Sequence, residues 1–215
     1  MHLVMFDIDG TLVDSHGFDG DLFAHAVRLE LGVQVDGTWQ SYRHVTDSGV
    51  LEEVLQQNVS AGERPQAFER VKRRFVGLVQ DYIAKRPAGL APIPGAPQLI
   101  KALRSRPGAV VAIATGGWRE TAEMKLKAVG IEFGGLPFAT SSDATARIDI
   151  MRLAEQQARL FGRITRRTYF GDAPWDKKAS ADLGYDFLAV GTRVEHPRSF
   201  DDLSDQESVL SVLGV

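Results

Sequence analysis

The sequence predicts an α/β protein in which a parallel sheet has helices on both faces and an all-helical segment follows the first strand. From residue 98 onward, short apolar runs alternate with helical patterns, which is typical of parallel sheets. Residues 15–87 carry helical patterns with few strand-like runs. A proline- and glycine-rich linker at residues 86–97 follows them. We therefore expect a core of residues 1–14 and 95–215, and a helical domain with its linkers at residues 15–94.

The first apolar run, residues 3–6, contains no charge and predicts a short buried strand. Asp7 and Asp9 follow it directly, and alternation along an extended chain brings both to one side. Clustered acids at the end of a buried strand suggest a divalent cation, because unpaired charges there would be costly. The Asp9-Gly10 pair is also a common turn signal, and a simple turn is the alternative.

Three apolar stripes at helical spacing cross the helical segment, at residues 22–31, 50–55 and 68–82. Gly32 is placed to end the first helix, and Pro65 suits the first turn of the third. These stripes predict three helices.

The remainder of the chain predicts four more strands, at residues 110–114, 137–140, 168–170 and 187–191. Helices are expected around Leu99 to Leu103, over about residues 120–129 and 150–160, up to Leu183, and near residues 205–213. The carboxyl ends of parallel strands share one edge of the sheet, where ligands bind in such folds.

Composition limits the possible functions. The chain has 215 residues, 44% hydrophobic and 25% charged, which fits one or two globular domains. A net charge of −3 gives no basic surface for nucleic acid or an anionic membrane. The absence of cysteine excludes disulfides, thiolate metal sites and cysteine nucleophiles. No apolar stretch reaches the length of a membrane span, and Met1 leads straight into the first strand. A cytoplasmic monomer or homodimer is expected.

Acidic residues follow two of the predicted strands, Asp7 and Asp9 the first and Asp172 and Asp176 the fourth. Four acids at one sheet edge form a hard oxygen site suited to Mg²⁺. For Asp172 and Asp176 the alternative is capping and first-turn charge of the helix that follows.

The second strand ends in Thr115, Gly116 and Gly117. The threonine hydroxyl and the glycine amides offer donors to a phosphate, since glycine allows close backbone approach. The alternative for Thr115 is a helix N-cap.

These motifs resemble, in order, those of the haloacid dehalogenase superfamily, specifically its phosphoglycolate phosphatase-like branch with a helical cap. The matching stretches are DIDGTLVD at residues 7–14, IATG at 113–116 and GDAPWD at 171–176. The resemblance implies a Rossmann-like core with a cap after the first strand. It also implies a Mg²⁺-dependent phosphatase that acts on a small phosphorylated metabolite, phosphoglycolate-like or a sugar phosphate.

The resemblance also implies residue roles. Asp7 would be the nucleophile that forms an aspartyl-phosphate, and Asp9 would protonate the leaving alcohol and then activate water. Mg²⁺ would be held by Asp7, the backbone carbonyl of Asp9, and Asp172, with Asp176 as a further or water-mediated ligand. Dehalogenase members lack the second acid, so Asp9 points to phosphoryl transfer. The expected substrate-binding residues are Gly10, Thr115, Gly116, Gly117 and Arg147.

One element departs from the family pattern, which places a lysine after the third strand. Residues 141–149 contain no lysine, and Arg147 is the best positional match. Arginine can bind phosphate with two parallel hydrogen bonds, so we expect Arg147 to supply this charge in catalysis. Four lysines are rivals and are expected to be surface charges: Lys125, Lys127, Lys177 and Lys178.

In the helical segment, residues 43–49 form a polar turn before the second helix. At least one of Thr46, Asp47 and Ser48 is expected to cap that helix, and the turn could also face the substrate's leaving group. His44 fits an exposed loop equally well. Trp118 and Trp175 lie in predicted loops beside the motifs and could wall the pocket, and Trp175 could equally pack between the domains.

Other functions remain open at this stage. A phosphomutase of the same superfamily would pass the phosphoryl group to a sugar phosphate instead of water. A phosphonate hydrolase would need a cap lysine, for which Lys72 and Lys85 are the candidates, and usually lacks the second acid. A non-catalytic binding module is favoured only by the missing lysine, and the intact acids argue against it.

Overall fold

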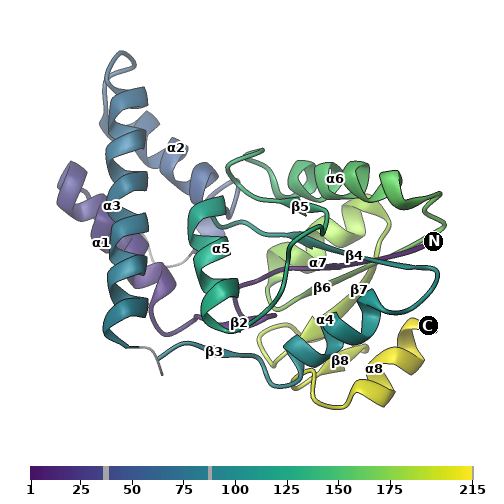
Figure 1. Cartoon of the computed structure of the whole chain (residues 1–215). Coiled ribbons are helices and arrows are strands. Elements are labelled where there is room, and N and C mark those ends of the chain that lie inside the picture. Colours follow the sequence, from purple (N-terminus) through teal and green to yellow (C-terminus); the bar gives the residue numbers. More distant parts are fainter. Residues whose placement is uncertain (36–38, 87–88, 215) are drawn as a thin grey trace.

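A six-stranded parallel sheet forms the centre of the larger part of the molecule (Figure 1). The computed structural model describes residues 1–35, 39–86 and 89–214. The strand order is β5-β4-β1-β6-β7-β8, and every neighbouring pair is parallel, which confirms the predicted fold class. The strands are β1 (His2–Phe6), β4 (Ala109–Ala114), β5 (Phe138–Ala139), β6 (Arg166–Gly171), β7 (Asp186–Val190) and β8 (Ser199–Phe200).

Helices cover both faces of this sheet. On one face, α4 (Ala96–Arg104), α5 (Arg119–Ala128) and α8 (Gln206–Leu213) pack against Val4, Phe6 and other side chains of the strands. On the other face, α6 (Arg147–Ala158) and α7 (Pro174–Leu183) pack against Leu3, Met5 and their neighbours. Figure 1 shows α6 above the sheet and α4 and α8 below it. The strands are apolar on both sides because neither face meets water.

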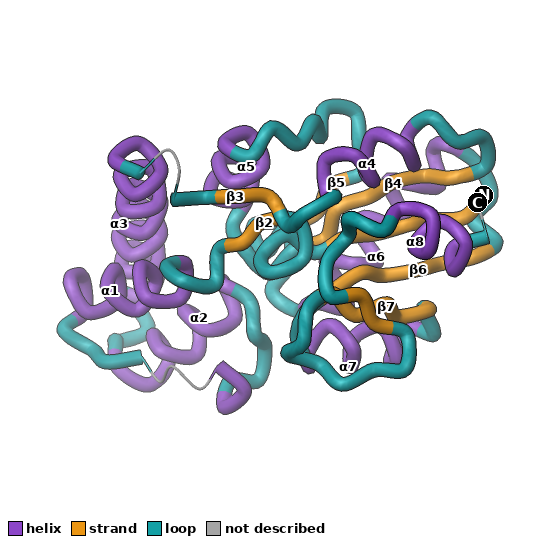
Figure 2. The backbone as a smooth tube through the Cα atoms, turned by 90° about the horizontal axis from the view of Figure 1, so that it is seen from below, coloured by secondary structure: helices purple, strands orange, loops and turns teal. Residues whose placement is uncertain are grey.

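The helical segment has an apolar interior of its own, built from α1 (Asp19–Leu31), α2 (Asp47–Asn58) and α3 (Arg64–Lys85). Figure 2 shows these helices gathered to one side of the sheet. As predicted, Gly32 ends α1 in the left-handed conformation, and Pro65 lies in the first turn of α3. A short 3₁₀ helix, Trp39–Ser41, lies between α1 and α2, and a second, Arg159–Phe161, follows α6.

Two short strands pair where the chain leaves the sheet region and where it returns. Strand β2 (Val13–Asp14) is antiparallel to β3 (Ala91–Pro92). The linker predicted at residues 86–97 thus contains a strand, and its residues 87 and 88 lie outside the described part of the chain. This pairing fastens both connections of the helical segment to each other.

The longest described helix, α3, has 22 residues and buries a stripe of Ala67, Val71, Phe75 and Val79. The rest of its surface is largely charged or polar. Neither α3 nor any other described helix combines the length and the apolar character needed to cross a membrane.

Candidate active site

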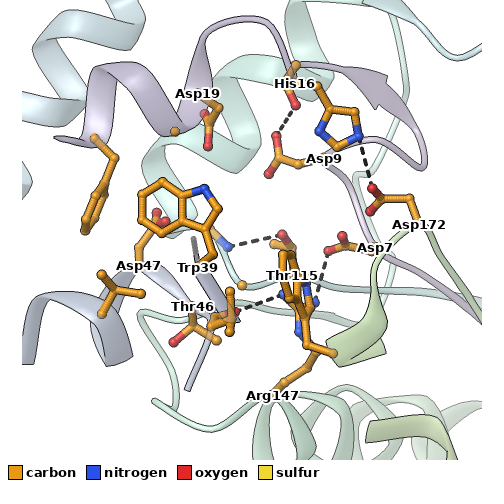
Figure 3. A pocket seen from close by; sticks show the side chains of 18 of the residues that line it. Asp7, Asp9, His16, Asp19, Trp39, Thr46, Asp47, Thr115, Arg147 and Asp172 are labelled. Carbon is orange, nitrogen blue, oxygen red and sulfur yellow. Dashed lines mark hydrogen bonds and ion pairs between the residues drawn. The ribbon is translucent and has the colours of Figure 1, made fainter. Parts of the chain in front are cut away.

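The exits of three strands meet at one edge of the sheet, as the parallel topology predicts. Phe6 at the end of β1 lies between Ile113 of β4 and Phe170 of β6. Asp7, Thr115 and Asp172 follow these strand ends and line a cavity of about 520 Å³ (Figure 3). The helical segment supplies the opposite wall, including Asp19, Phe23, Trp39 and Asp47.

Three buried acids form a group at this cavity, where Asp7 and Asp172 belong to its lining and Asp176 lies behind them. Asp7, Asp172 and Asp176 each offer one carboxylate oxygen, and these oxygens lie within 4.8 Å of one another. Burial and then the Asp176 carboxylate raise the pKa of Asp7 well above its usual range, and burial raises that of Asp176 to about 6. Carboxylate oxygens are the donors that hard divalent cations prefer. A cation among them would offset their mutual repulsion, so this donor set fits Mg²⁺.

Arg147 lies beside this group, as the first residue of α6. Its Nη1 is 2.8 Å from Asp176 Oδ1 and 3.4 Å from Asp7 Oδ1. Its Nη2 donates to the Val45 carbonyl at 3.3 Å. Gly116 makes room for it, because a Cβ there would lie 2.5 Å from Nη2. The guanidinium therefore reaches Asp7 from the first turn of α6, at the position after β5 where the sequence predicts this charge.

The expected exposure of the four rival lysines is correct for three of them and wrong for Lys125. Lys127, Lys177 and Lys178 are exposed. Lys125 is only 1% exposed and lies on the inner stripe of α5 with Ala122 and Leu126. Its ammonium is buried because two carboxylates, rather than water, solvate it.

The partners of Lys125 are Asp9 and Asp19. Lys125 Nζ lies 2.5 Å from Asp9 Oδ1 and 2.9 Å from Asp19 Oδ1. Ser15 Oγ also donates to Asp9 Oδ1, at 2.5 Å. Burial by itself would raise the pKa of Asp9, but the attraction and hydrogen bond of Lys125 outweigh it and lower that pKa. Lys125 and Ser15 thus hold one oxygen of the Asp9 carboxyl group in a fixed place.

Two acids of the helical segment face the same region. Burial raises the pKa of Asp19 to about 6 and that of Asp47 to about 8, with Asp19 adding to the effect on Asp47. Asp47 Oδ2 accepts a hydrogen bond from the Trp118 amide at 2.8 Å. This wall of the cavity is therefore acidic and aromatic.

The glycine turn after β4 does not cap a helix through Thr115. Thr115 Oγ1 accepts from the Gly117 amide at 3.2 Å, and the N-cap residue of α5 is Trp118. The capping alternative holds instead for Asp176, whose Oδ2 accepts from the Ala173 amide at 3.1 Å. Thr115, Gly116 and Gly117 all line the cavity.

Asp172 has two basic neighbours. Arg193 Nη1 and His16 Nε2 lie 2.8 and 3.0 Å from Asp172 Oδ2. Gly10 has a φ of +77°, and a Cβ there would lie 2.6 Å from the same oxygen and 2.2 Å from His16 Nε2. Only glycine fits this turn. The Gly10 amide donates to the Val13 carbonyl at 2.8 Å.

The polar turn before α2 joins the helical segment to the sheet region. Thr46 caps α2 by accepting from the Gly49 amide at 3.0 Å, as predicted. The Asp47 amide donates to the Gly116 carbonyl at 2.8 Å, and Ser48 Oγ donates to the Ser141 carbonyl at 2.6 Å. Trp118 Nε1 donates to Ser48 Oγ at 2.8 Å. The turn therefore lies against the segments that follow β4 and β5.

Of the two tryptophans that could wall the pocket, Trp175 does so and Trp118 does not. Trp118 is fully buried among side chains of the helical segment, and it does not line the cavity among the described residues. Trp175 belongs to α7 rather than to a loop, and it lines the cavity.

Five residues near the reactive groups were not anticipated: Ser15, His16, Asp19, Trp39 and Arg193. Each comes from a loop, a short 3₁₀ helix or the first turn of a helix, where no periodic pattern marks an inward-facing side chain. For Lys125, by contrast, the sequence did contain a signal of burial. It lies three residues after Ala122, on a stripe of α5 whose other members are apolar or small.

A family model described as haloacid dehalogenase-like hydrolase matches residues 1–184. The chain belongs to this family of hydrolases. No match was found among curated proteins.

Solved structures share the fold over nearly the whole chain. A hydrolase from Pseudomonas syringae has 19% identity and a TM-score of 0.74, with 99% of both chains covered. CbbY from Rhodobacter sphaeroides, in complex with phosphate, has 20% identity and a TM-score of 0.69, covering 94% of this chain and 95% of that one. A β-phosphoglucomutase from Clostridium difficile has 15% identity and a TM-score of 0.73, covering 99% and 96%. At these identities the likeness concerns the fold alone.

Proposed function

We propose that this protein is a Mg²⁺-dependent phosphatase that hydrolyses a small phosphorylated metabolite through an aspartyl-phosphate on Asp7. One observation carries the proposal: Arg147 lies against Asp7 at the acid group formed with Asp172 and Asp176. A nucleophilic carboxylate, a cation site and a fixed guanidinium are what transfer of a phosphate dianion requires.

The metal would be held by the side chains of Asp7 and Asp172 and the backbone carbonyl of Asp9. Asp176 would serve as a further or water-mediated ligand, since its Oδ1 is 2.8 Å from Arg147. When bound, Mg²⁺ supplies charge neutralisation between the phosphate and the carboxylates.

The reaction then has two displacements at phosphorus. In the first, an Asp7 oxygen attacks the phosphorus while the bond to the leaving oxygen breaks, and Asp9 gives that oxygen a proton. In the second, Asp9 takes a proton from water as the water oxygen attacks the aspartyl-phosphate. Inorganic phosphate leaves, and both carboxyl groups return to their starting forms. Arg147, Thr115 and the turn amides orient the phosphoryl oxygens in both steps.

Residues 15–94 would act as a cap over a catalytic core of residues 1–14 and 95–215. The cavity lies between the two, and its outer wall carries Asp19, Trp39 and Asp47. A cap that closes over the acids excludes water during transfer. Two linkers fastened by the β2–β3 pair would let it move as a unit.

The substrate would be a small phosphorylated metabolite, phosphoglycolate-like or a sugar phosphate. A cavity of about 520 Å³ has room for a molecule of this size. The similar fold of CbbY is known in complex with phosphate, which agrees with a phosphate-bearing ligand. A phosphomutase remains the alternative, and it differs only in what accepts the phosphoryl group.

The test is release of inorganic phosphate from p-nitrophenyl phosphate and from a panel of phosphorylated metabolites, with and without Mg²⁺. Asp7→Asn should abolish turnover and phosphoenzyme formation at an unchanged melting temperature, because an amide cannot form the acyl phosphate. Asp201→Asn, at an exposed position away from the cavity, is the matched control and should behave as wild type. A folded Asp7→Asn variant of near wild-type rate would remove Asp7 from this role. Isomerisation of a sugar phosphate without net phosphate release would favour the mutase.

A further inference from the structure

Lys125 places a buried ammonium at the junction of the sheet region and the helical segment. It is one of the largest fully buried side chains among the described residues. Its Nζ contacts Asp9 at 2.5 Å, on the loop after β1, and Asp19 at 2.9 Å, in the first turn of α1. Burying an ammonium group costs free energy unless carboxylates pair with it at hydrogen-bonding distance. The two ion pairs of Lys125 therefore hold the three side chains in a fixed geometry.

The two oxygens of Asp9 have different surroundings. Oδ1 accepts from both Lys125 and Ser15. Oδ2 lies on the side of the glycine turn, where a Cβ added to Gly117 would be 3.7 Å from it. Among the described residues, every hydrogen bond to this carboxylate goes to Oδ1. The clamp on one oxygen therefore fixes the direction in which the other points.

We propose that Lys125 is a positioning residue for proton transfer by Asp9. It holds Oδ1, so that Oδ2 is presented toward the substrate's leaving oxygen, and through Asp19 it ties this orientation to helix α1. The inference rests on the proposed function, in which Asp9 transfers the proton.

The role has a chemical consequence that a purely structural ion group lacks. An alkoxide is a poor leaving group and needs the proton of Asp9 as the bond to phosphorus breaks. p-Nitrophenolate is stable as an anion and leaves without that proton. Loss of orientation at Asp9 should therefore slow the first displacement of an alkyl phosphate much more than that of p-nitrophenyl phosphate.

The experiment measures leaving-group release in single turnovers, with enzyme in excess, from p-nitrophenyl phosphate and from glycerol phosphate. Lys125→Met keeps the length of the side chain and removes its charge. We expect Lys125→Met to lower the single-turnover rate with glycerol phosphate, relative to the rate with p-nitrophenyl phosphate, by about tenfold or more. Lys125→Arg, which retains a donor to both acids, should recover part of the difference.

Two further variants complete the test. Lys127 lies two residues along α5, where its side chain is 66% exposed and contacts Glu123 and the ring of Phe133. Lys127→Met should match wild type with both substrates. Lys125→Met/Asp19→Asn removes the buried ammonium together with one of its partly buried carboxylate partners, and it keeps the test open if Lys125→Met does not fold. It should show the same selective loss.

Equal loss with both substrates, or no loss with either, in a folded variant would overturn the positioning role. Failure of wild-type protein to release either leaving group would instead overturn the proposed function, and the role of Lys125 with it. The two failures are thus told apart by the wild-type measurement.

Discussion

The Arg147 guanidinium forms ion pairs with both Asp7 and Asp176. Both ion pairs use Nη1, at 3.4 and 2.8 Å, and the side chain is 11% exposed. An arginine can keep such protein contacts and still present other donors to a phosphate, whereas a lysine offers one compact charge. The departure from the family's lysine therefore fits the site that surrounds it.

Replacement of Arg147 tests this directly. Arg147→Ala should lower kcat by roughly a hundredfold or more, because one preorganised charge contact in the transition state is lost. Arg147→Lys should recover only part of the rate, since the ammonium cannot reproduce the fork. Steady-state kinetics of both variants is the measurement. The control is Lys177→Ala, at an exposed lysine outside the cavity lining. If Arg147→Ala has nearly the wild-type kcat while Lys177→Ala loses most of its activity, the phosphate-binding charge would belong to Lys177 of α7 instead.

Asp172 belongs to the acid group that would hold the cation. Asp172→Ala removes one fixed carboxylate from the acid group and leaves Arg193 and His16 without this partner. We expect the Mg²⁺ concentration for half-maximal activity to rise by about tenfold or more. Titration of Mg²⁺ by calorimetry should show the same weakening without substrate. An unchanged Mg²⁺ response in both measurements would locate the ion elsewhere.

The residues that could be foreseen from the sequence lie at strand ends. Asp7, Thr115 and Asp172 converge because parallel strands exit at one edge, which pattern and topology determine together. Their neighbours His16 and Arg193 could not be foreseen, because the paths of two loops bring them to Asp172. Lys125 was misassigned for a physical reason: a lysine on a helix is assumed solvated unless a buried partner is known.

At the level of elements, the polar turn at residues 43–49 and helix α2, which begins within it, connect the two parts of the molecule. Asp47 is bound to the Trp118 amide through Oδ2 and also lines the cavity. Val45 and Thr46 line it as well. This turn lies both against the loops after the strands and along the cavity, so we expect it to select the leaving group in the proposed reaction.

Asp47→Asn tests this placement with little change of shape. We expect it to alter the order of KM values among phosphorylated metabolites. kcat for p-nitrophenyl phosphate should stay within about threefold of wild type, because the reacting groups are untouched. Gln57→Ala, on the exposed face of the same helix, serves as the control. An unchanged ranking would assign specificity to the core loops.

The long elements were predictable, and of the two-residue strands in the described part of the chain only β5 was, as part of the strand expected at residues 137–140. The apolar stripes of the helices and the runs of β1 and β4 span enough residues to show a period or a buried stretch. β2, β3 and β8 have two residues each, too few to show alternation. Their pairing depends on where distant parts of the chain bring them.

On the scale of the whole molecule, Glu155 joins elements that lie far apart in the sequence. On α6, it accepts from Arg167 of β6 at 2.7 Å and from the hydroxyl of Tyr185, just before β7, at 2.5 Å. The Arg167 hydrogen bond, followed by those of Tyr185 and Arg159, outweighs burial and lowers the pKa of Glu155 from 4.5 to about 2.

The depressed pKa of Glu155 gives a stability prediction with a definite sign. The folded protein binds this proton less readily than the unfolded chain. The stabilisation is therefore complete above about pH 4.5 and is lost as the pH falls toward about 2. Glu155→Gln should lower the melting temperature at pH 7, and its difference from wild type should shrink over that interval. Thermal unfolding at a series of pH values measures both. A constant difference down to pH 2 would contradict the assignment, and Glu207→Gln, at an exposed position, is the control.

Trp118 belongs to the start of α5, yet its ring completes the interior of the helical segment. Ring centroids of Phe23, Phe68 and Phe75 lie 5.7–5.8 Å from it. During synthesis, α1, α2 and α3 are all made before Trp118, and α3 ends 33 residues earlier, at Lys85. We therefore expect the interior of the three helices to lack this ring until Trp118 has been synthesised and has left the ribosome. A fragment that ends after α3 would lack the Trp118 ring that fills its interior. Because the helical segment depends on this residue of the sheet region, we expect the two parts to unfold in one thermal transition.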